Sequence, residues 1–187
     1  MGYPLPVIVQ GDSRRLREHV ARADCVISSP PYSALGVKIK GHGIKGAGVS
    51  SGRNYGKAEY GATPGQLGTT SGDTFWTAAR DIVAECYAIL RPGGVCVWVT
   101  KAFVRKGKIV DFPGDWRRLC EHAGFVMERE AHAMLVKEQR GGHLFEPEYR
   151  KVTKRVSFFR RLAEAKGSPA IDYEVVQFMR RPEALSN

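Results

Sequence analysis

Short runs of β-branched residues alternate with helix-like segments along this chain, and this alternation is what most constrains its fold. Val7–Gln10 is the first such run, and we expect it to form a buried parallel strand. Ser13–Ala23 has the pattern of a short helix, with Asp12 or the first residue of the segment as its N-cap. Cys25–Ser28 is a second strand-like run, which Pro30–Pro31 stops. Two strands joined by a helix form a βαβ unit.

The rest of the chain continues this alternation after a long interruption. Apolar residues recur at helical spacing from Phe75 to Leu90. The further predicted elements are a turn at Arg91–Gly94, strands at Val95–Val99, within Phe125–Leu135 and at Glu174–Met179, a helix over Asp115–Ala123, and a basic helix over Pro147–Ala165. The pattern predicts one α/β domain over residues 1–187, in which crossover helices flank a sheet.

The interruption is a glycine-rich segment, Gly36–Gly72, which contains eleven glycines and shows no apolar periodicity. We expect a flexible, basic and functional or disordered loop at 36–72, since structureless segments of this length are uncommon inside compact domains. Its basic residues are Lys38, Lys40, Lys45, Arg53 and Lys57. Gly41–Gly46 fits the dinucleotide-binding spacing GxGxxG, but no convincing strand precedes it and no helix follows it.

Composition restricts the partners and the compartment. The net charge of +10 and the pI of about 9.7 favour a polyanionic partner, although a basic surface kept for solubility has the same charge. No apolar run approaches the roughly 20 residues that span a bilayer, so we expect a cytoplasmic protein with no membrane partner. The four cysteines form no CxxC pair and are expected to be buried and reduced. The five histidines show no ligand spacing, and we predict no metal site.

The stretch Ser28–Ser33, which reads SSPPYS, has the residues needed to methylate an exocyclic amine. The amine lone pair of a base is delocalised into the ring, so the amine is a poor nucleophile. Two rigidly placed acceptors for its hydrogens favour a tetrahedral nitrogen and direct the lone pair at a methyl donor. Ser29 offers a hydroxyl oxygen and Pro30 a main-chain carbonyl, while Pro31 restricts the backbone. Tyr32 offers a ring on which a flipped base can stack, although a packing residue in a Pro-Pro turn is the structural alternative.

This opening resembles the amino-methyltransferases of bacterial and phage modification systems, in which the catalytic motif precedes the cofactor motif. The resemblance begins with Gly11-Asp12-Ser13, Leu16 and Cys25–Tyr32. It continues through Tyr60-Gly61, Leu90–Gly94, Asp115–Phe125 and Tyr173–Met179, and so covers most of the chain outside the glycine-rich loop. It implies a Rossmann-like sheet with flanking helices that binds S-adenosylmethionine and acts on DNA.

The resemblance also implies roles for particular residues. Ser29, Pro30, Pro31 and Tyr32 form the catalytic pocket. Asp12 and Ser28 lie on the cofactor side, and capping the following helix is an equal alternative for Asp12. Serine at position 29 is similar to the cytosine N4 enzymes, whereas aspartate is commoner in the adenine N6 enzymes. The expected phosphate contacts are Lys38, Lys40, Lys45, Arg53, Lys57, Arg150, Lys154 and Arg161.

One family feature is missing. Members with this motif order carry a glycine-rich segment similar to DPFxGSGT, which wraps the methionine part of the cofactor, and no such segment occurs in the 187 residues. We therefore expect a methyltransferase sheet that carries the catalytic motif and half of the cofactor site. A second polypeptide or a second copy is a candidate for completing that site. A nucleic-acid-binding subunit or remnant without catalysis is the rival interpretation, and an RNA substrate is a further one.

Overall fold

The computed structural model describes residues 5–31, 67, 73–134, 136–141, 149–154, 164–165 and 167–183. These residues belong to two compact units. The first comprises Met1–Arg22 and Pro31–Ile89, and the second comprises Ala23–Pro30 and Leu90–Asn187. The glycine-rich loop predicted at 36–72 lies outside the described residues except for Leu67, so its flexibility and the single domain remain predictions.

The first unit contains the short 3-10 helix η1, Ser13–Glu18, and the α-helix α1, Asp73–Ile89. The predicted helix after Asp12 is therefore present but shorter than Ser13–Ala23. In α1, one helical face buries Phe75, Ala79, Val83 and Cys86, as the periodicity predicted. An ion pair joins the two helices, with 2.6 Å between Arg17 Nη2 and Glu85 Oε1.

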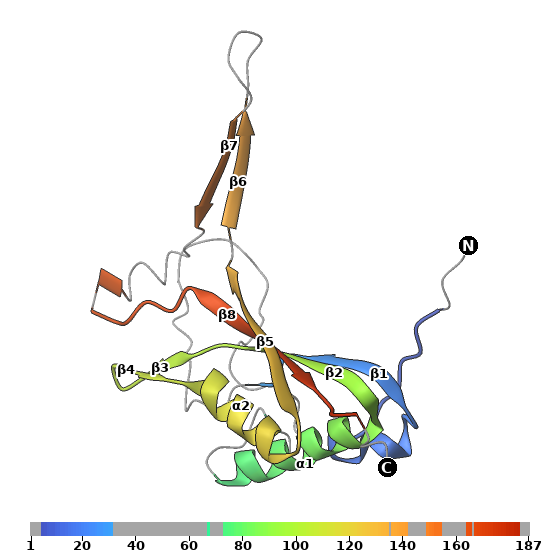
Figure 1. Ribbon diagram of the computed structural model, residues 1–187. Coiled ribbons are helices and arrows are strands. Elements are labelled where there is room, and N and C mark those ends of the chain that lie inside the picture. The colour runs from blue at the N-terminus through green and yellow to red at the C-terminus, as the bar shows by residue number, and fades with distance from the viewer. Residues whose placement is uncertain are drawn as a thin grey trace, which may run out of the picture. The chain divides into compact units, whose positions relative to one another are not determined.

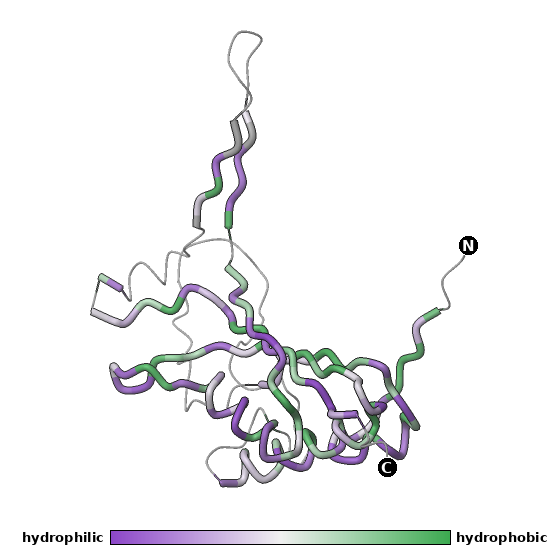
Figure 2. The backbone as a smooth tube through the Cα atoms, in the orientation of Figure 1, coloured by the Kyte–Doolittle hydropathy of each residue, from purple (hydrophilic) through white to green (hydrophobic). Residues whose placement is uncertain are grey.

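The prediction that Val7–Gln10 forms a buried strand is wrong. These residues have no strand structure, and Val7 and Ile8 are 87% and 94% exposed. Figure 2 shows this apolar stretch next to the N-terminus. A β-branched run becomes a strand only where a neighbouring strand accepts its main-chain hydrogen bonds, and no described residue of the first unit forms such a strand.

The second unit is built on a four-stranded mixed sheet of order β1-β2-β8-β5 (Figure 1). Its strands are β1 Ala23–Ser28, β2 Leu90–Thr100, β5 Val126–Met134 and β8 Tyr173–Arg180. β1 and β2 are parallel, whereas β8 runs antiparallel to both β2 and β5. Four of the five strands predicted from the sequence form this sheet, and the structure adds the two antiparallel pairings.

The turn predicted at Arg91–Gly94 lies inside the bounds of β2. Its effect on the pairing is a shift of register, since Ala23 pairs with Leu90 but Cys25 pairs with Val95. Gly93 has a φ of 73°, which only glycine adopts without strain. The turn residues are therefore accommodated as an irregularity of the β1–β2 pair.

Helix α2, Phe112–His122, packs against the sheet of the second unit through aromatic side chains. Trp98 of β2 and Trp116 of α2 make an edge-to-face contact with 5.2 Å between ring centroids, and both are buried. Gln177 Nε2 of β8 donates to the Pro113 carbonyl at 3.0 Å. The helix starts three residues before the predicted Asp115, because Asp111 caps it by accepting from the Gly114 amide at 3.0 Å.

Two hairpins form separate two-stranded sheets. One pairs β3, Phe103–Arg105, with β4, Lys108–Val110, and the other pairs β6, Val136–Gly141, with β7, Tyr149–Lys154. The basic helix predicted over Pro147–Ala165 is thus wrong for its first part. Tyr149, Val152 and Thr153 favour a strand, and pairing with β6 outweighs the helical spacing of the apolar residues.

Two further observations bear on the sequence expectations. Cys86, Cys96 and Cys120 are buried as expected, but Cys25 is exposed on β1, contrary to the prediction. No helix among the described residues is long and apolar enough to cross a membrane.

Candidate active site at the end of strand β1

Ser29 follows the last residue of β1, at the carboxyl end of the parallel pair β1–β2. Ser28 pairs with Trp98, which brings the next residue of each strand, Ser29 and Val99, side by side. The Ser29 hydroxyl donates to the Val99 carbonyl at 3.1 Å. A hydroxyl has one hydrogen to donate and two lone pairs, so this bond orients Oγ and leaves its acceptor capacity available. Because Ser29 is exposed, an incoming amine can reach that oxygen.

The residues around Ser29 differ in burial along the motif. Ser28 is half-buried, Pro30 is buried and Pro31 is half-buried. Burial and the fixed φ of proline both restrict the backbone that follows the serine. Tyr32, the predicted stacking residue, lies outside the described residues. The structure therefore places Ser28, Ser29 and Pro30 together at the strand end, and the ring of Tyr32 remains a prediction.

The edge of the sheet at this site is open in the described part of the chain. β1 is the terminal strand of the sheet and pairs only with β2 there. Ile27, two residues before Ser29, is 75% exposed, and Cys25 is exposed as well. An apolar strand edge beside a candidate catalytic residue is a surface where further polypeptide can pair.

Asp12 belongs to the first unit, whereas Ser28–Pro30 belong to the second. Its carboxylate caps η1 by accepting from the Arg14 amide at 2.9 Å, which confirms the capping alternative. It also pairs with the Arg14 guanidinium, with 2.6 Å between Nη2 and Oδ2. Hydrogen bonds from the Arg14 side chain and amide lower the pKa of Asp12 from 3.8 to about 2. Its side chain is 36% exposed, so an ionised acceptor stays accessible.

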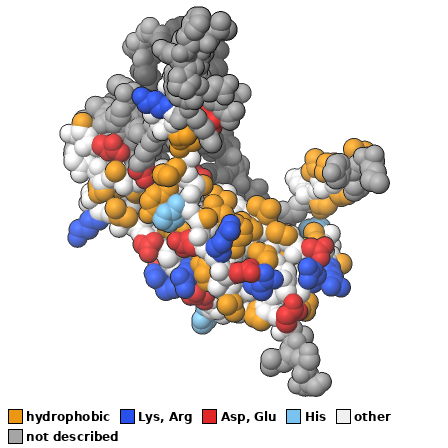
Figure 3. Space-filling view, turned by 45° about the horizontal axis from the view of Figure 1, so that its top comes forward, with side chains coloured by type: hydrophobic (Ala, Val, Ile, Leu, Met, Phe, Trp, Pro, Cys, Tyr) orange, Lys and Arg blue, Asp and Glu red, His pale blue; other side chains and the backbone are white. Residues whose placement is uncertain are grey.

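The predicted DNA-contact residues fall into two groups. Arg150 and Lys154 lie on strand β7 and not on a helix. Lys38, Lys40, Lys45, Arg53, Lys57 and Arg161 lie outside the described residues. On the face that Figure 3 presents, Lys and Arg side chains are interspersed with Asp and Glu. Across the described residues, no group of three or more His, Cys, Asp or Glu is placed to hold a metal ion.

Two structural features beside the predicted site residues were not predicted from the sequence. The first is the Val99 carbonyl, which could have been found from the expected parallel pairing of Cys25–Ser28 with Val95–Val99. The second is strand β6, where Lys137 and Arg140 stand opposite β7. Residues 136–141 read VKEQRG and show no apolar–polar alternation, so the local pattern gave no signal for this strand.

Comparison with known proteins supports the fold. No protein-family model and no curated protein matches the sequence. The structure of TTHA0409 from Thermus thermophilus, named as a "Putative DNA Modification Methylase", matches with 17% identity and a TM-score of 0.50 over 95% of this chain and 54% of that chain. The structure of TTHA0409 complexed with S-adenosyl-L-methionine matches with 16% identity and a TM-score of 0.50 over 95% of this chain and 56% of that one. The two proteins share a mixed α/β fold, and this chain spans about half the length of the structures it matches.

Proposed function

We propose that this chain is an S-adenosylmethionine-dependent DNA methyltransferase, or the part of one that carries the catalytic motif. Its target is the exocyclic amino group of a base flipped from the duplex, with cytosine N4 as the preferred target and adenine N6 as the alternative. The fold shared with TTHA0409 supports the class of protein. The hydrogen bond between Ser29 Oγ and the Val99 carbonyl is the observation that carries the chemistry.

The proposed chemistry depends on where the Ser29 hydroxyl hydrogen goes. Since this hydrogen is donated to Val99, Oγ presents lone pairs and accepts one hydrogen of the base amine. The carbonyl of the buried Pro30 accepts the other. These two bonds draw the amine toward a tetrahedral geometry and free its lone pair, and the fixed backbone means that little reorganisation is needed. Tyr32 is proposed to stack on the flipped base.

S-adenosylmethionine would supply the methyl group, and two residues of this chain are its proposed contacts. The Asp12 carboxyl has a pKa of about 2 and is therefore ionised near neutral pH, and its side chain is accessible. It can therefore accept hydrogen bonds from the hydroxyl or amino groups of a nucleoside. Ser28, half-buried at the end of β1, is the other proposed contact. The methionine part of the cofactor has no evident partner among the described residues.

A catalytically incomplete nucleic-acid-binding subunit is the second candidate. The open, apolar edge of β1 favours it. Such a subunit would bind DNA without transferring a methyl group by itself, and would regain activity with the polypeptide that completes it.

The deciding experiment is methyl transfer to duplex DNA of mixed sequence, followed by nucleoside mass analysis. We expect N4-methylcytosine from the wild type, and a loss of roughly 100-fold or more in Ser29→Ala, as for other fixed hydrogen-bonding groups in active sites. Tyr32→Ala should lose most activity as well.

A matched control removes a hydroxyl that is not one of the proposed pocket groups. Thr77 of α1 is exposed, and its hydroxyl also donates to a main-chain carbonyl, that of Asp73, at 2.8 Å. Thr77→Ala therefore deletes a bond of the same kind as Ser29→Ala, and it should leave methyl transfer unchanged.

Each outcome has a defined meaning. If Ser29→Ala and Tyr32→Ala both keep wild-type rates, the catalytic assignment is wrong. If N6-methyladenine is the only product, the target base is adenine and the protein is still a DNA methyltransferase that acts on an exocyclic amine. If a parallel assay shows methyl transfer to RNA and none to DNA, the substrate is RNA and not DNA.

A further inference from the structure

The β6–β7 hairpin is a two-stranded ribbon whose two faces are both exposed. Lys137, Glu138 and Gln139 are consecutive and all exposed, so neither face of β6 is covered at these positions. No strand of the other sheets pairs with β6 or β7 in the described part of the chain. An isolated two-stranded hairpin is only marginally stable in water. A partner that covers one face would stabilise this hairpin, so we expect it to be a binding element.

The charge of the ribbon indicates the chemistry of that partner. The two strands carry five basic residues, Lys137, Arg140, Arg150, Lys151 and Lys154, and a single acidic residue, Glu138. This excess of positive charge on so short an element favours an anionic partner.

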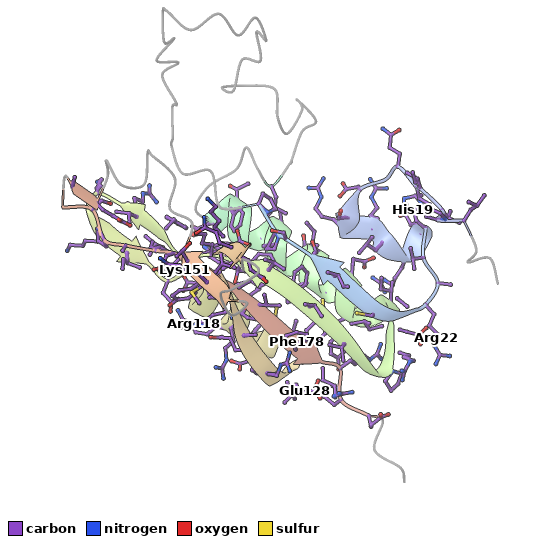
Figure 4. All side chains as sticks on the ribbon, turned by 90° about the horizontal axis from the view of Figure 1, so that it is seen from above. His19, Arg22, Arg118, Glu128, Lys151 and Phe178 are labelled. Atoms are coloured by element: carbon purple, nitrogen blue, oxygen red, sulfur yellow. The ribbon has the colours of Figure 1, made fainter. Side chains whose placement is uncertain are left out.

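One face of the ribbon suits hydrogen bonding to nucleic acid. Lys137 pairs in register with Thr153, and Gln139 with Lys151, so these four alternate residues share a face. Lys137, Gln139 and Lys151 are exposed, and Lys151 is labelled in Figure 4. Glu138 and Val152 pair with each other and belong to the opposite face. The first face therefore offers donors and no carboxylate.

We infer that the β6–β7 ribbon binds duplex DNA in the major groove, with the face of Lys137, Gln139 and Lys151 turned toward it. The major groove is wide enough for a two-stranded β-ribbon, and the minor groove of B-DNA is much narrower. Lysine can donate to guanine or to phosphate, and glutamine can bond adenine, so this face supplies affinity and readout. The inference rests on the proposed DNA substrate and adds the element that engages it (Figure 1).

The test measures the salt dependence of binding of the full chain to a fluorescent DNA duplex. Each phosphate contact contributes about 0.9 to the slope of log K against log salt concentration. The double variant Lys137→Gln, Lys151→Gln should lower the slope by about 2 and weaken binding roughly 30-fold near 0.15 M salt. The charge-conserving variant Lys137→Arg, Lys151→Arg should bind as the wild type does.

The matched control removes two positive charges elsewhere. Arg117 and Arg118 of α2 are exposed, and they bond Glu121 and Asp115 of the same helix. Arg117→Gln, Arg118→Gln lowers the net charge equally but should leave the slope unchanged. Thermal melts of all the variants check that the fold is intact.

The groove is tested by competition with groove-specific ligands. Methyl green, which occupies the major groove, should displace the chain from the duplex, while netropsin in the minor groove should not. The opposite result, or equal affinity for single-stranded DNA, overturns the groove assignment. If the wild type binds duplex DNA but the Lys137→Gln, Lys151→Gln variant has the same salt slope, the assignment of the ribbon is wrong and the proposed DNA substrate stands. A wild type without any affinity for duplex DNA overturns both the ribbon and the proposed DNA substrate.

Discussion

The hydroxyl of Ser29 is oriented by main chain and not by another side chain. Its acceptor, the Val99 carbonyl, belongs to β2, and the parallel pairing of β1 with β2 sets their separation. The orientation therefore depends on the register of two strands, which the buried Trp98, paired with Ser28, helps to fix. A residue that looks isolated in the sequence thus derives its geometry from a partner about 70 residues away.

At Asp12, substitutions can separate the structural role from a role in cofactor binding. Asp12→Ala removes both the cap of η1 and the pairing with Arg14, and should cost at least about 1 kcal/mol, whereas Asp12→Asn keeps a capping acceptor and should lose only the pairing with Arg14. Urea unfolding of both variants measures this. If Asp12 also contacts the cofactor through its charge, both variants should bind S-adenosylmethionine more weakly than the wild type. Unchanged stability in Asp12→Ala would contradict the capping role.

The pKa of Asp12 gives the capping contact a pH dependence. Its folded pKa of about 2 lies below the ordinary 3.8, so the carboxylate stabilises the fold fully above pH 3.8. This contribution is lost as the pH falls through 3.8 toward 2, since the protonated acid can no longer pair with Arg14. The gap in stability between wild type and Asp12→Asn should therefore narrow over this range.

At the level of elements, the sequence predicted what local chemistry decides. The helix from Phe75 and the strand at Glu174–Met179 are present because their apolar periodicity matches their burial. The strand at Cys25–Ser28 is present through its pairing with β2, although Cys25 and Ile27 are exposed. The predictions for Val7–Gln10 and for the first part of Pro147–Ala165 were wrong because strand formation depends on a pairing partner. The first run lacks one among the described residues, and the second finds one in β6. The Ser29–Val99 contact depended on sheet register, which no local pattern specifies.

Helix α2 should be held to its sheet mainly by Trp116. This side chain is fully buried and contacts the rings of Trp98 and Phe112. Trp116→Ala removes that packing and leaves a cavity, so we expect a loss of about 3–5 kcal/mol in the free energy of unfolding. Arg117→Ala, on the exposed side of the same helix, should change it by less than about 1 kcal/mol. Urea denaturation measures both, and equal effects would contradict this view of α2.

For the whole molecule, much of the described positive charge is balanced locally. Arg14, Arg17, Arg80, Arg91, Arg117, Arg118 and Arg180 each lie in an ion pair with an Asp or Glu. In the second unit, the Arg129 guanidinium stacks over the ring of Phe178 at 4.6 Å from its centroid. The count of 29 Lys and Arg residues therefore overstates how basic these surfaces are. This is why the β6–β7 ribbon, with five basic residues and one acidic residue, stands out as the polyanion-binding element.

The isolated chain should bind S-adenosylmethionine weakly, or require a second polypeptide or copy. The sequence has no segment similar to DPFxGSGT, and glycine there would let backbone approach the cofactor closely. Each lost charge-assisted hydrogen bond to the methionine tail is worth roughly 1.5–3 kcal/mol, so a few of them weaken binding by orders of magnitude. The open edge of β1 beside Ser29 and the exposed Val7 and Ile8 are surfaces that further polypeptide could cover. Calorimetry on the purified chain measures the affinity and the stoichiometry. Micromolar affinity at one cofactor per monomer, without any partner, would show that the chain holds the whole cofactor by itself.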